Sequence, residues 1–87
     1  MNQVQQKIQY LLDKSQEEAS EIVQAVSKIR RFGPDSQHPN RKTTNKQELI
    51  SEIEDFMAII GALEHLQYFD LRTSQQNILN KAQALLK

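Results

Sequence analysis

Residues 51–60, Ser-Glu-Ile-Glu-Asp-Phe-Met-Ala-Ile-Ile, decide the fold that this chain can adopt. Apolar side chains recur every three or four residues through this stretch and on both sides of it. They lie at Leu49, Ile50, Ile53, Phe56, Met57, Ile60, Leu63 and Leu66. This spacing predicts a helix, and Thr44 with Gln47 has capping-box spacing, so we expect the helix to begin near Asn45. Because it is apolar on more than one face around residues 56–63, it is expected to be central.

A long helix is predicted before this one, over about residues 3–31, where apolar positions follow a 3-4-3 rhythm. It should end at Gly33-Pro34, because Gly terminates helices and Pro cannot continue one. Ser15 and Glu18 also have capping-box spacing, so two helices broken near Ser15 are the alternative. No Gly or Pro imposes that break, which favours one helix with a possible bend.

A last helix is predicted after Thr73 or Ser74, either of which can cap it. Its inward-facing residues are expected to be Ile78, Leu79, Ala82, Leu85 and Leu86. Since strand-like alternation is absent, the expected fold class is all-α: an antiparallel helical bundle with three to four helices per chain, in a single domain over residues 1–87. Wide apolar faces on three helices exceed what 87 residues can cover, so we expect oligomerisation to complete the bundle.

Composition excludes several functional classes. The formal net charge is zero, which gives no overall attraction to nucleic acid polymers or to membranes. The chain has no Cys, which excludes disulfides, thiolate zinc sites and cysteine nucleophiles. The longest apolar run, residues 56–63, is too short to cross a bilayer, and there is no basic-then-apolar leader. A cytoplasmic location is therefore expected.

Two pairs of carboxylates have the spacing of a metal site. Glu18 with Glu21, and Glu52 with Asp55, are each three residues apart within a predicted helix, so each pair lies on one helix face. Two such faces turned toward each other would bring four acids together, which is costly without a cation. Oxygen-only ligands favour magnesium or manganese. A single acidic pair is more often a solvated helix surface, but two pairs in matching context favour ligands.

Basic residues concentrate between the two acidic pairs. Lys28 lies two turns after Glu21 on the same helical face, where it could reach a phosphate beside the metal. Arg30 or Arg31, with Arg41 or Lys42, could complete a phosphate clamp. Cations near a helix C-terminus also favour the helix dipole, which is a sufficient structural reason for them. Several of these cations flank the polar segment 33–44, which holds both prolines and is expected to be a loop that binds or covers a ligand.

The motifs in this order resemble a known family. Glu17-Glu18-Ala19-Ser20-Glu21 fits an EExxE motif, and Glu52-Ile53-Glu54-Asp55 fits an ExxD motif. Lys28-Ile29-Arg30-Arg31-Phe32-Gly33 closes the first motif helix. Over about residues 11–66 the chain resembles the all-α nucleoside triphosphate pyrophosphohydrolases of the MazG-like group. The last helix matches weakly, and the loop at 33–44 makes the gap between motifs longer than the family usually shows.

The resemblance implies a dimer or a dimer of dimers that hydrolyses a (deoxy)nucleoside triphosphate to the monophosphate and pyrophosphate. Mg2+, for which Mn2+ could substitute, would be held by four ligands: Glu18, Glu21, Glu52 and Asp55. Glu17 and Glu21 are both candidates to activate water, and neither is preferred from sequence. The phosphate-binding candidates are Lys28, Arg31, Arg41 and Lys81, the last suggested only by the family's closing helix.

Two alternative functions stay open at this stage. One is a small helical protein-interaction module whose acids are surface charge and whose apolar faces bind a partner. The other is a hydrolase of the same fold that acts on another diphosphate bond, such as that of a phosphoribosyl nucleotide.

Overall fold

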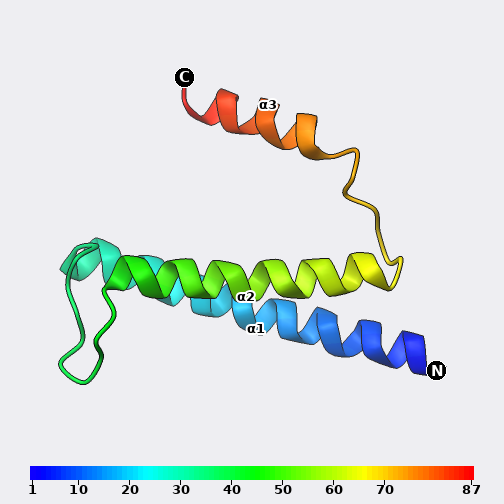
Figure 1. The fold of residues 1–87 in the computed structure, drawn as a ribbon, viewed down its shortest axis with the longest axis horizontal. Helices are drawn as coiled ribbons and strands as arrows, with labels where there is room; N and C mark the ends of the chain where they lie inside the picture. The colour runs from blue at the N-terminus through cyan, green and yellow to red at the C-terminus, as the bar shows by residue number, and fades with distance from the viewer.

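The computed structural model describes all residues, 1–87, and contains three α-helices and no strand (Figure 1). The helices are α1 (Gln3–Phe32), α2 (Asn45–His65) and α3 (Gln75–Leu85). Helices α1 and α2 run antiparallel and side by side as a hairpin, whereas α3 stands apart from both. The predicted all-α class is therefore confirmed.

Helix α1 is continuous, so the alternative with a break near Ser15 is wrong. The hydroxyl of Ser15 donates a hydrogen bond to the carbonyl of Leu12 at 2.7 Å. Ser15 therefore bonds to the backbone of the same helix and does not cap a second helix. The helix is capped at its C-terminus by Gly33, which has a φ of 90°. The backbone N–H of Gly33 donates a hydrogen bond to the Ile29 carbonyl. A side chain at Gly33 would be strained there, which explains why the predicted terminator works.

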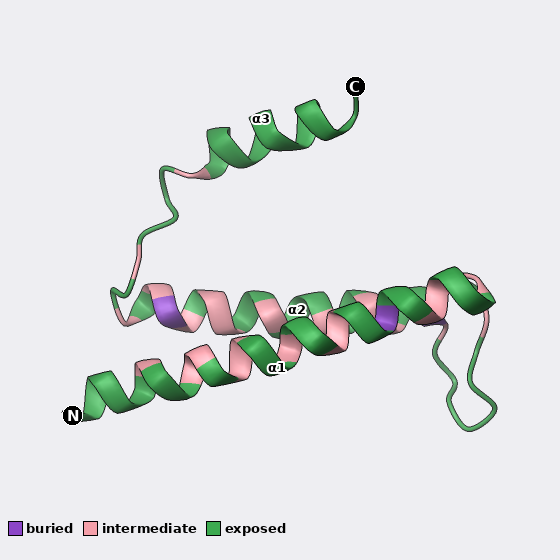
Figure 2. Cartoon of the chain, turned by 180° about the vertical axis from the view of Figure 1, so that it is seen from behind, coloured by how far each residue is buried: buried purple, intermediate pink, exposed green.

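The contact between α1 and α2 follows a spacing of alternating three and four residues. Its half-buried and buried positions include 8, 11, 15, 18, 22, 25 and 29 on α1, and 45, 49, 52, 56, 59, 63 and 66 on α2. Figure 2 shows buried and half-buried residues along both helices of the hairpin, whereas α3 is exposed throughout. Only Ala25, Asn45 and Leu63 are fully buried, so most of the seam is a two-helix contact open at its edges. Positions 18 and 52 are glutamates, so two acids interrupt an otherwise largely apolar seam.

The loop between α1 and α2 is fixed at its base by Asn45. The side-chain amide of Asn45 donates to the Gly33 carbonyl at 3.1 Å, and its backbone N–H donates to the Ser36 carbonyl at 2.9 Å. Thr44 caps α2 with both halves of the predicted capping box, in which Gln47 is the partner. The loop is therefore tied to the hairpin by directed bonds.

Helix α2 ends without a glycine. Gln67 adopts a left-handed conformation with a φ of 62°. The amide of Gln67 donates to the Glu64 carbonyl at 2.9 Å, and that of Tyr68 donates to the Leu63 carbonyl at 3.0 Å. This pair of bonds is the Schellman arrangement that closes many helices.

Helix α3 packs on neither α1 nor α2, so the expectation that its apolar residues face inward is wrong for the single chain. Ile78 and Leu79 are 60% and 51% exposed, and Leu85 and Leu86 are more exposed still. The reason is the connection from α2, which leads away from the hairpin before α3 begins (Figure 1). A single chain thus forms a helical hairpin plus a separate helix. No helix is both long and apolar enough to span a membrane.

Candidate metal site

Three of the predicted acids meet between α1 and α2. Glu18, Glu52 and Asp55 each contribute one carboxylate oxygen to a group in which all three oxygens lie within 4.8 Å of one another. Glu18 comes from α1 and the other two come from α2, so the hairpin itself brings the two motifs together. The seam spacing explains this, because positions 18 and 52 both lie in the contact stripe.

Two oxygens in this cluster are buried and lack a hydrogen-bond partner. They are Oε2 of Glu18 and Oε2 of Glu52. Neighbouring carboxylates cannot satisfy each other when all are ionised, because each is then only an acceptor. The neighbouring carboxyl group of Glu21, followed by burial and the carboxyl group of Glu18, raises the pKa of Glu52 to about 7. The cluster therefore needs either a shared proton or a cation.

Glu21, the fourth predicted ligand, lies outside this group of three. It influences the pKa of Glu52 most strongly and lines a cavity of about 230 Å³ together with Glu52. The other residues of this acidic cavity are Gln24, Ala25, Lys28, Arg41 and Glu48. Carboxylates and two cations thus share one small space, an arrangement that suits a metal ion next to anionic phosphate oxygens.

Arg41 reaches the acidic cavity from the loop and is held in place by Glu48. Its Nη1 donates to Oε1 of Glu48 at 2.6 Å, and the hydroxyl of Thr43 donates to the same oxygen at 3.2 Å. The hydrogen bond from Arg41 holds the pKa of Glu48 below its usual value and raises the pKa of Arg41. Because the Arg41 side chain is still 55% exposed, part of the guanidinium is free to contact a ligand.

Three predicted site residues lie elsewhere in the single chain. Glu17 is exposed and pairs with Lys14 at 3.4 Å instead of joining the cluster. The guanidinium of Arg31 lies 5.1 Å from the centre of the Phe32 ring and does not line the acidic cavity. Lys81 belongs to α3, which contacts neither helix of the hairpin.

The acids of the cluster lie at different depths. Asp55, which precedes the apolar run 56–60, is exposed, whereas Glu52 is half-buried. The seam takes positions 52 and 56, which places position 55 on its rim. Asp55 can therefore contact both the cluster and a ligand from solvent.

Sequence reasoning missed three residues of this region: Gln24, Asn45 and Glu48. Glu48 precedes Glu52 by four residues and therefore lies on the same face, so its spacing was a usable signal. Gln24 follows Glu21 by three residues and carries the same signal. Asn45 had no signal beyond its place at the start of α2, because its bonds to the loop are tertiary.

The donor set fits a hard divalent ion. All the clustered ligands are carboxylate oxygens, and His38 and His65 lie outside the cluster. Oxygen ligands suit Mg2+ and Mn2+, and the unpartnered oxygens of Glu18 and Glu52 are the atoms that would gain most from such an ion.

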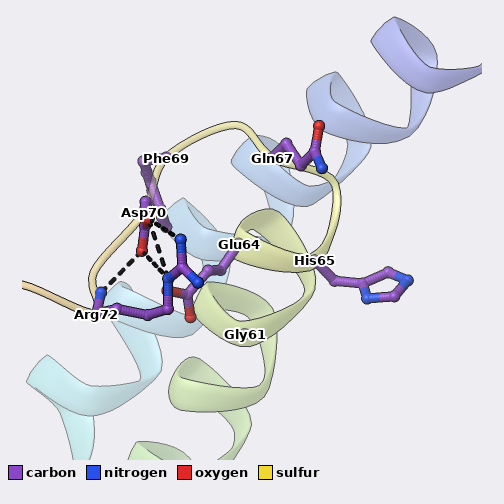
Figure 3. A pocket seen from close by; sticks show the side chains of 7 residues that line it. All are labelled: Gly61, Glu64, His65, Gln67, Phe69, Asp70 and Arg72. Carbon is purple, nitrogen blue, oxygen red and sulfur yellow. Dashed lines mark hydrogen bonds and ion pairs between the residues drawn. The ribbon is translucent and has the colours of Figure 1, made fainter.

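A larger cavity, about 670 Å³, lies at the other end of α2, and its lining has no buried side-chain atom that lacks a hydrogen-bond partner (Figure 3). Its charged groups pair with one another: Arg72 donates to both oxygens of Asp70, with the shortest contact at 2.7 Å. Glu64 accepts from the Leu71 amide at 2.9 Å. His65 points away from this group. These contacts fix the connection to α3 and give the carboxylates of Glu64 and Asp70 hydrogen-bond partners.

Neither a known protein family, nor a protein of established function, nor a solved structure shows significant similarity to this chain. The resemblance to MazG-like pyrophosphohydrolases thus rests on the two acidic motifs, their order and the residues between them.

Proposed function

We propose that the protein is a magnesium-dependent nucleotide pyrophosphohydrolase, which converts a (deoxy)nucleoside triphosphate to its monophosphate and pyrophosphate. The observation that carries this proposal is the pair of buried, unpartnered carboxylate oxygens of Glu18 and Glu52 beside a cavity that also holds Lys28 and Arg41. The unpartnered carboxylates favour binding of a metal cation, and the neighbouring side chains of Lys28 and Arg41 favour binding of an anion. A metal–triphosphate complex supplies both.

The proposed metal ligands are Glu18, Glu21, Glu52 and Asp55. When bound there, Mg2+ would neutralise phosphate oxygens and keep coordination positions for them and for water. Mn2+ is the proposed substitute. The carboxylates serve this purpose because they come from two helices that the seam already holds together, so little reorganisation is needed on binding.

Glu21 is the preferred group for activating water. It lines the acidic cavity, whereas Glu17 points its charge toward Lys14. In the proposed reaction the water oxygen bonds to the α-phosphorus as the bond from that phosphorus to the bridging oxygen breaks. Pyrophosphate leaves, and Glu21 holds the proton that the water gives up.

Lys28 and Arg41 are the proposed phosphate contacts. Both line the acidic cavity, Lys28 from α1 and Arg41 from the loop. Because they come from different segments of the chain, the two cations would contact a bound phosphate chain at different points and so help to position it for in-line attack.

The proposal includes assembly of two or four copies. Only three of 87 residues are fully buried, and apolar side chains on both helices of the hairpin are exposed, among them Val23, Ile50, Ile53 and Met57. A chain of this size needs more buried area than that to be stable. Helix-on-helix contacts between copies would bury these faces and α3, and could bring Lys81 of one copy to the site of another.

The proposal is tested by incubating the protein with Mg2+ and a panel of nucleoside and deoxynucleoside triphosphates. The pyrophosphate that is released is measured. At least one member should be cleaved to monophosphate and pyrophosphate, and chelation should stop the reaction. If pyrophosphate is released only from a phosphoribosyl nucleotide, the protein is instead the hydrolase of the same fold that acts on that diphosphate bond. If no compound is cleaved at high enzyme concentration, the enzymatic proposal fails.

A second candidate is a helical interaction module, which the exposed stripe on α3 favours. Ile78, Leu79 and Leu85 lie on a helix that contacts nothing else in the chain. Under that function the acids would be surface charge, yet the oxygens of Glu18 and Glu52 are buried. The same nucleotide panel separates the two candidates.

A further inference from the structure

The loop between α1 and α2 forms a cavity of its own. It has a volume of about 200 Å³ and lies between the end of α1, the start of α2 and the loop. The residues lining this loop cavity are Lys28, Phe32, Ser36, Gln37, His38, Pro39, Asn45 and Glu48. Residues 36–39 belong to the polar segment 33–44 that joins the two motif helices.

The loop cavity and the acidic cavity adjoin. Lys28 and Glu48 line both of them. A ligand with its phosphates against Lys28 in the acidic cavity therefore has the loop cavity as the next space beyond the same side chain. The two cavities also differ in chemistry, because the acidic cavity is lined by five charged residues with one glutamine and one alanine, whereas the loop cavity includes an aromatic ring and a proline.

The loop cavity is held open by hydrogen bonds within the loop. The side chain of Gln37 donates to the Lys42 carbonyl at 3.1 Å, and Gln37 pairs with Thr44 in an isolated bridge. Asn45 ties Gly33 and Ser36 to the start of α2. Because these bonds fix the loop on both sides of the cavity, a ligand would bind without ordering the loop first.

The lining offers a surface for stacking and groups for hydrogen bonds. The Phe32 ring is 60% exposed, and Arg31 lies over it at 5.1 Å. Nδ1 of His38 accepts from the Asn40 amide at 3.2 Å, so in the neutral ring Nε2 carries the proton and is a donor. The side-chain nitrogen of Gln37 is used within the loop, which leaves its oxygen as an acceptor.

From these observations we infer that the loop cavity binds the nucleobase of the substrate, with the Phe32 ring as its stacking surface and with Gln37 and His38 facing the base edge. This inference rests on the proposed function, because it needs phosphates in the acidic cavity. A flat ring between an aromatic side chain and polar groups is the usual way in which proteins hold a base. Base preference is then set by the loop, and the reaction by the acids.

The test compares Phe32→Ala with Tyr10→Ala. Both aromatic residues lie on α1 and are 60% exposed, but Tyr10 lines neither cavity, so its variant is the matched control. Steady-state kinetics are measured with the best substrate of the nucleotide panel, and inorganic tripolyphosphate is used as a competitive inhibitor that has no base. Phe32→Ala should raise KM about tenfold with little change in kcat. The inhibition constant of tripolyphosphate should stay unchanged, and Tyr10→Ala should behave as the wild type.

The inference is overturned if Phe32→Ala leaves KM unchanged, or if it weakens tripolyphosphate as much as the nucleotide. If Phe32→Ala does not fold, His38→Ala in the loop is tested in the same way and judged by the same outcomes. A second measurement separates this inference from the proposed function. Amide NMR shifts of the wild-type chain are followed during titration with nucleoside monophosphates. Shifts centred on residues 32–39 support the base site even where no hydrolysis is found, and shifts elsewhere or none contradict it.

Discussion

The hairpin carries two clusters of charged side chains, and their charges are balanced in different ways. At the end of α2, Asp70 pairs with Arg72, and Glu64 accepts a backbone amide. In the middle of the hairpin, Glu18 and Glu52 have buried oxygens without any partner. Both regions are rich in polar atoms and both adjoin a cavity, and the cavity at the end of α2 is the larger one.

Under the proposed function, the unpartnered oxygens of Glu18 and Glu52 mark the site, although the cavity beside them is the smaller of the two. The charges at the end of α2 are already compensated and hold the connection to α3 in place. Between the helices, Glu21, burial and Glu18 raise the pKa of Glu52 to about 7, and a cation would stabilise its ionised form. Four experiments test this difference between the two clusters.

The largest effect is expected from Asp55→Asn. The change removes one charge from the acidic cluster and keeps the shape of the side chain, so pyrophosphate release should fall by at least about 100-fold. Because Asp55 is exposed, the helical circular dichroism spectrum should not change. Glu54→Gln is the control, since Glu54 is an exposed neighbour outside the cluster, and it should retain activity. Full turnover by Asp55→Asn would remove Asp55 from the ligand set.

Magnesium should raise the melting temperature of the protein without nucleotide. Binding to the native state alone stabilises it by about 2.7 kcal/mol when the free metal is 100 times its Kd. For a domain of this size that is a shift of roughly 10 °C or more, measured by thermal denaturation. Replacing both Glu18 and Glu52 by Gln should abolish the shift, whereas Asp70→Asn should keep it. A shift that survives the double substitution would place the metal elsewhere.

Without metal, the stability of the native state should fall as pH rises from about 4.5 to 7. The folded pKa of Glu52 is raised from 4.5 to about 7, so across this window the folded state holds a proton that the unfolded state has lost. The stabilising effect of that proton is complete below the unfolded pKa and absent above the folded one. Since Glu52 is partly solvated, the loss should be on the order of 1 kcal/mol.

Glu52→Gln isolates this effect, because Gln does not titrate. Chemical denaturation at several pH values should show a smaller decline in the variant than in the wild type between pH 5 and 7.5. Saturating Mg2+ should reduce the decline in the wild type as well. Parallel curves for the two proteins would mean that Glu52 is ionised throughout and that the cluster carries no shared proton.

The smallest effect is expected from Arg72→Ala at the end of α2. The Arg72 side chain is 84% exposed, and exposed ion pairs contribute little because solvent screens them. Nucleotide hydrolysis and the magnesium-dependent melting shift should both be unchanged. A loss of activity in this variant would show that the connection to α3 positions part of the site, and would weaken the contrast between the two clusters.

Much of the hairpin could be predicted from local signals. The start of α2 at Asn45 followed from the capping spacing of Thr44 and Gln47, and the end of α1 followed from Gly33. These signals act within a few residues, so the sequence displays them directly. The end of α2 followed only from the last apolar position, Leu66, because Gln67, which closes the helix, takes a left-handed conformation that usually marks glycine.

The candidate site was predictable in part. The spacing of the acidic pairs placed each pair on a helix face, but not the depth of its members. Glu52 lies in the seam and Asp55 on its rim because the α1 contact selects positions 45, 49, 52 and 56 of α2. The roles of Glu17, Arg31 and Lys81 could not be judged from spacing, since each depends on contacts that only the folded chain shows.

The sequence alone determined three helices, their approximate limits and two acidic faces, because helical periodicity, caps and breakers are local properties. The tertiary structure decided which acids meet, which oxygens lose their water without gaining a partner, and that α3 lies free of the hairpin. Those outcomes depend on the register between α1 and α2 and on the bonds that Asn45 makes across the loop, and both are set by packing between segments distant in sequence.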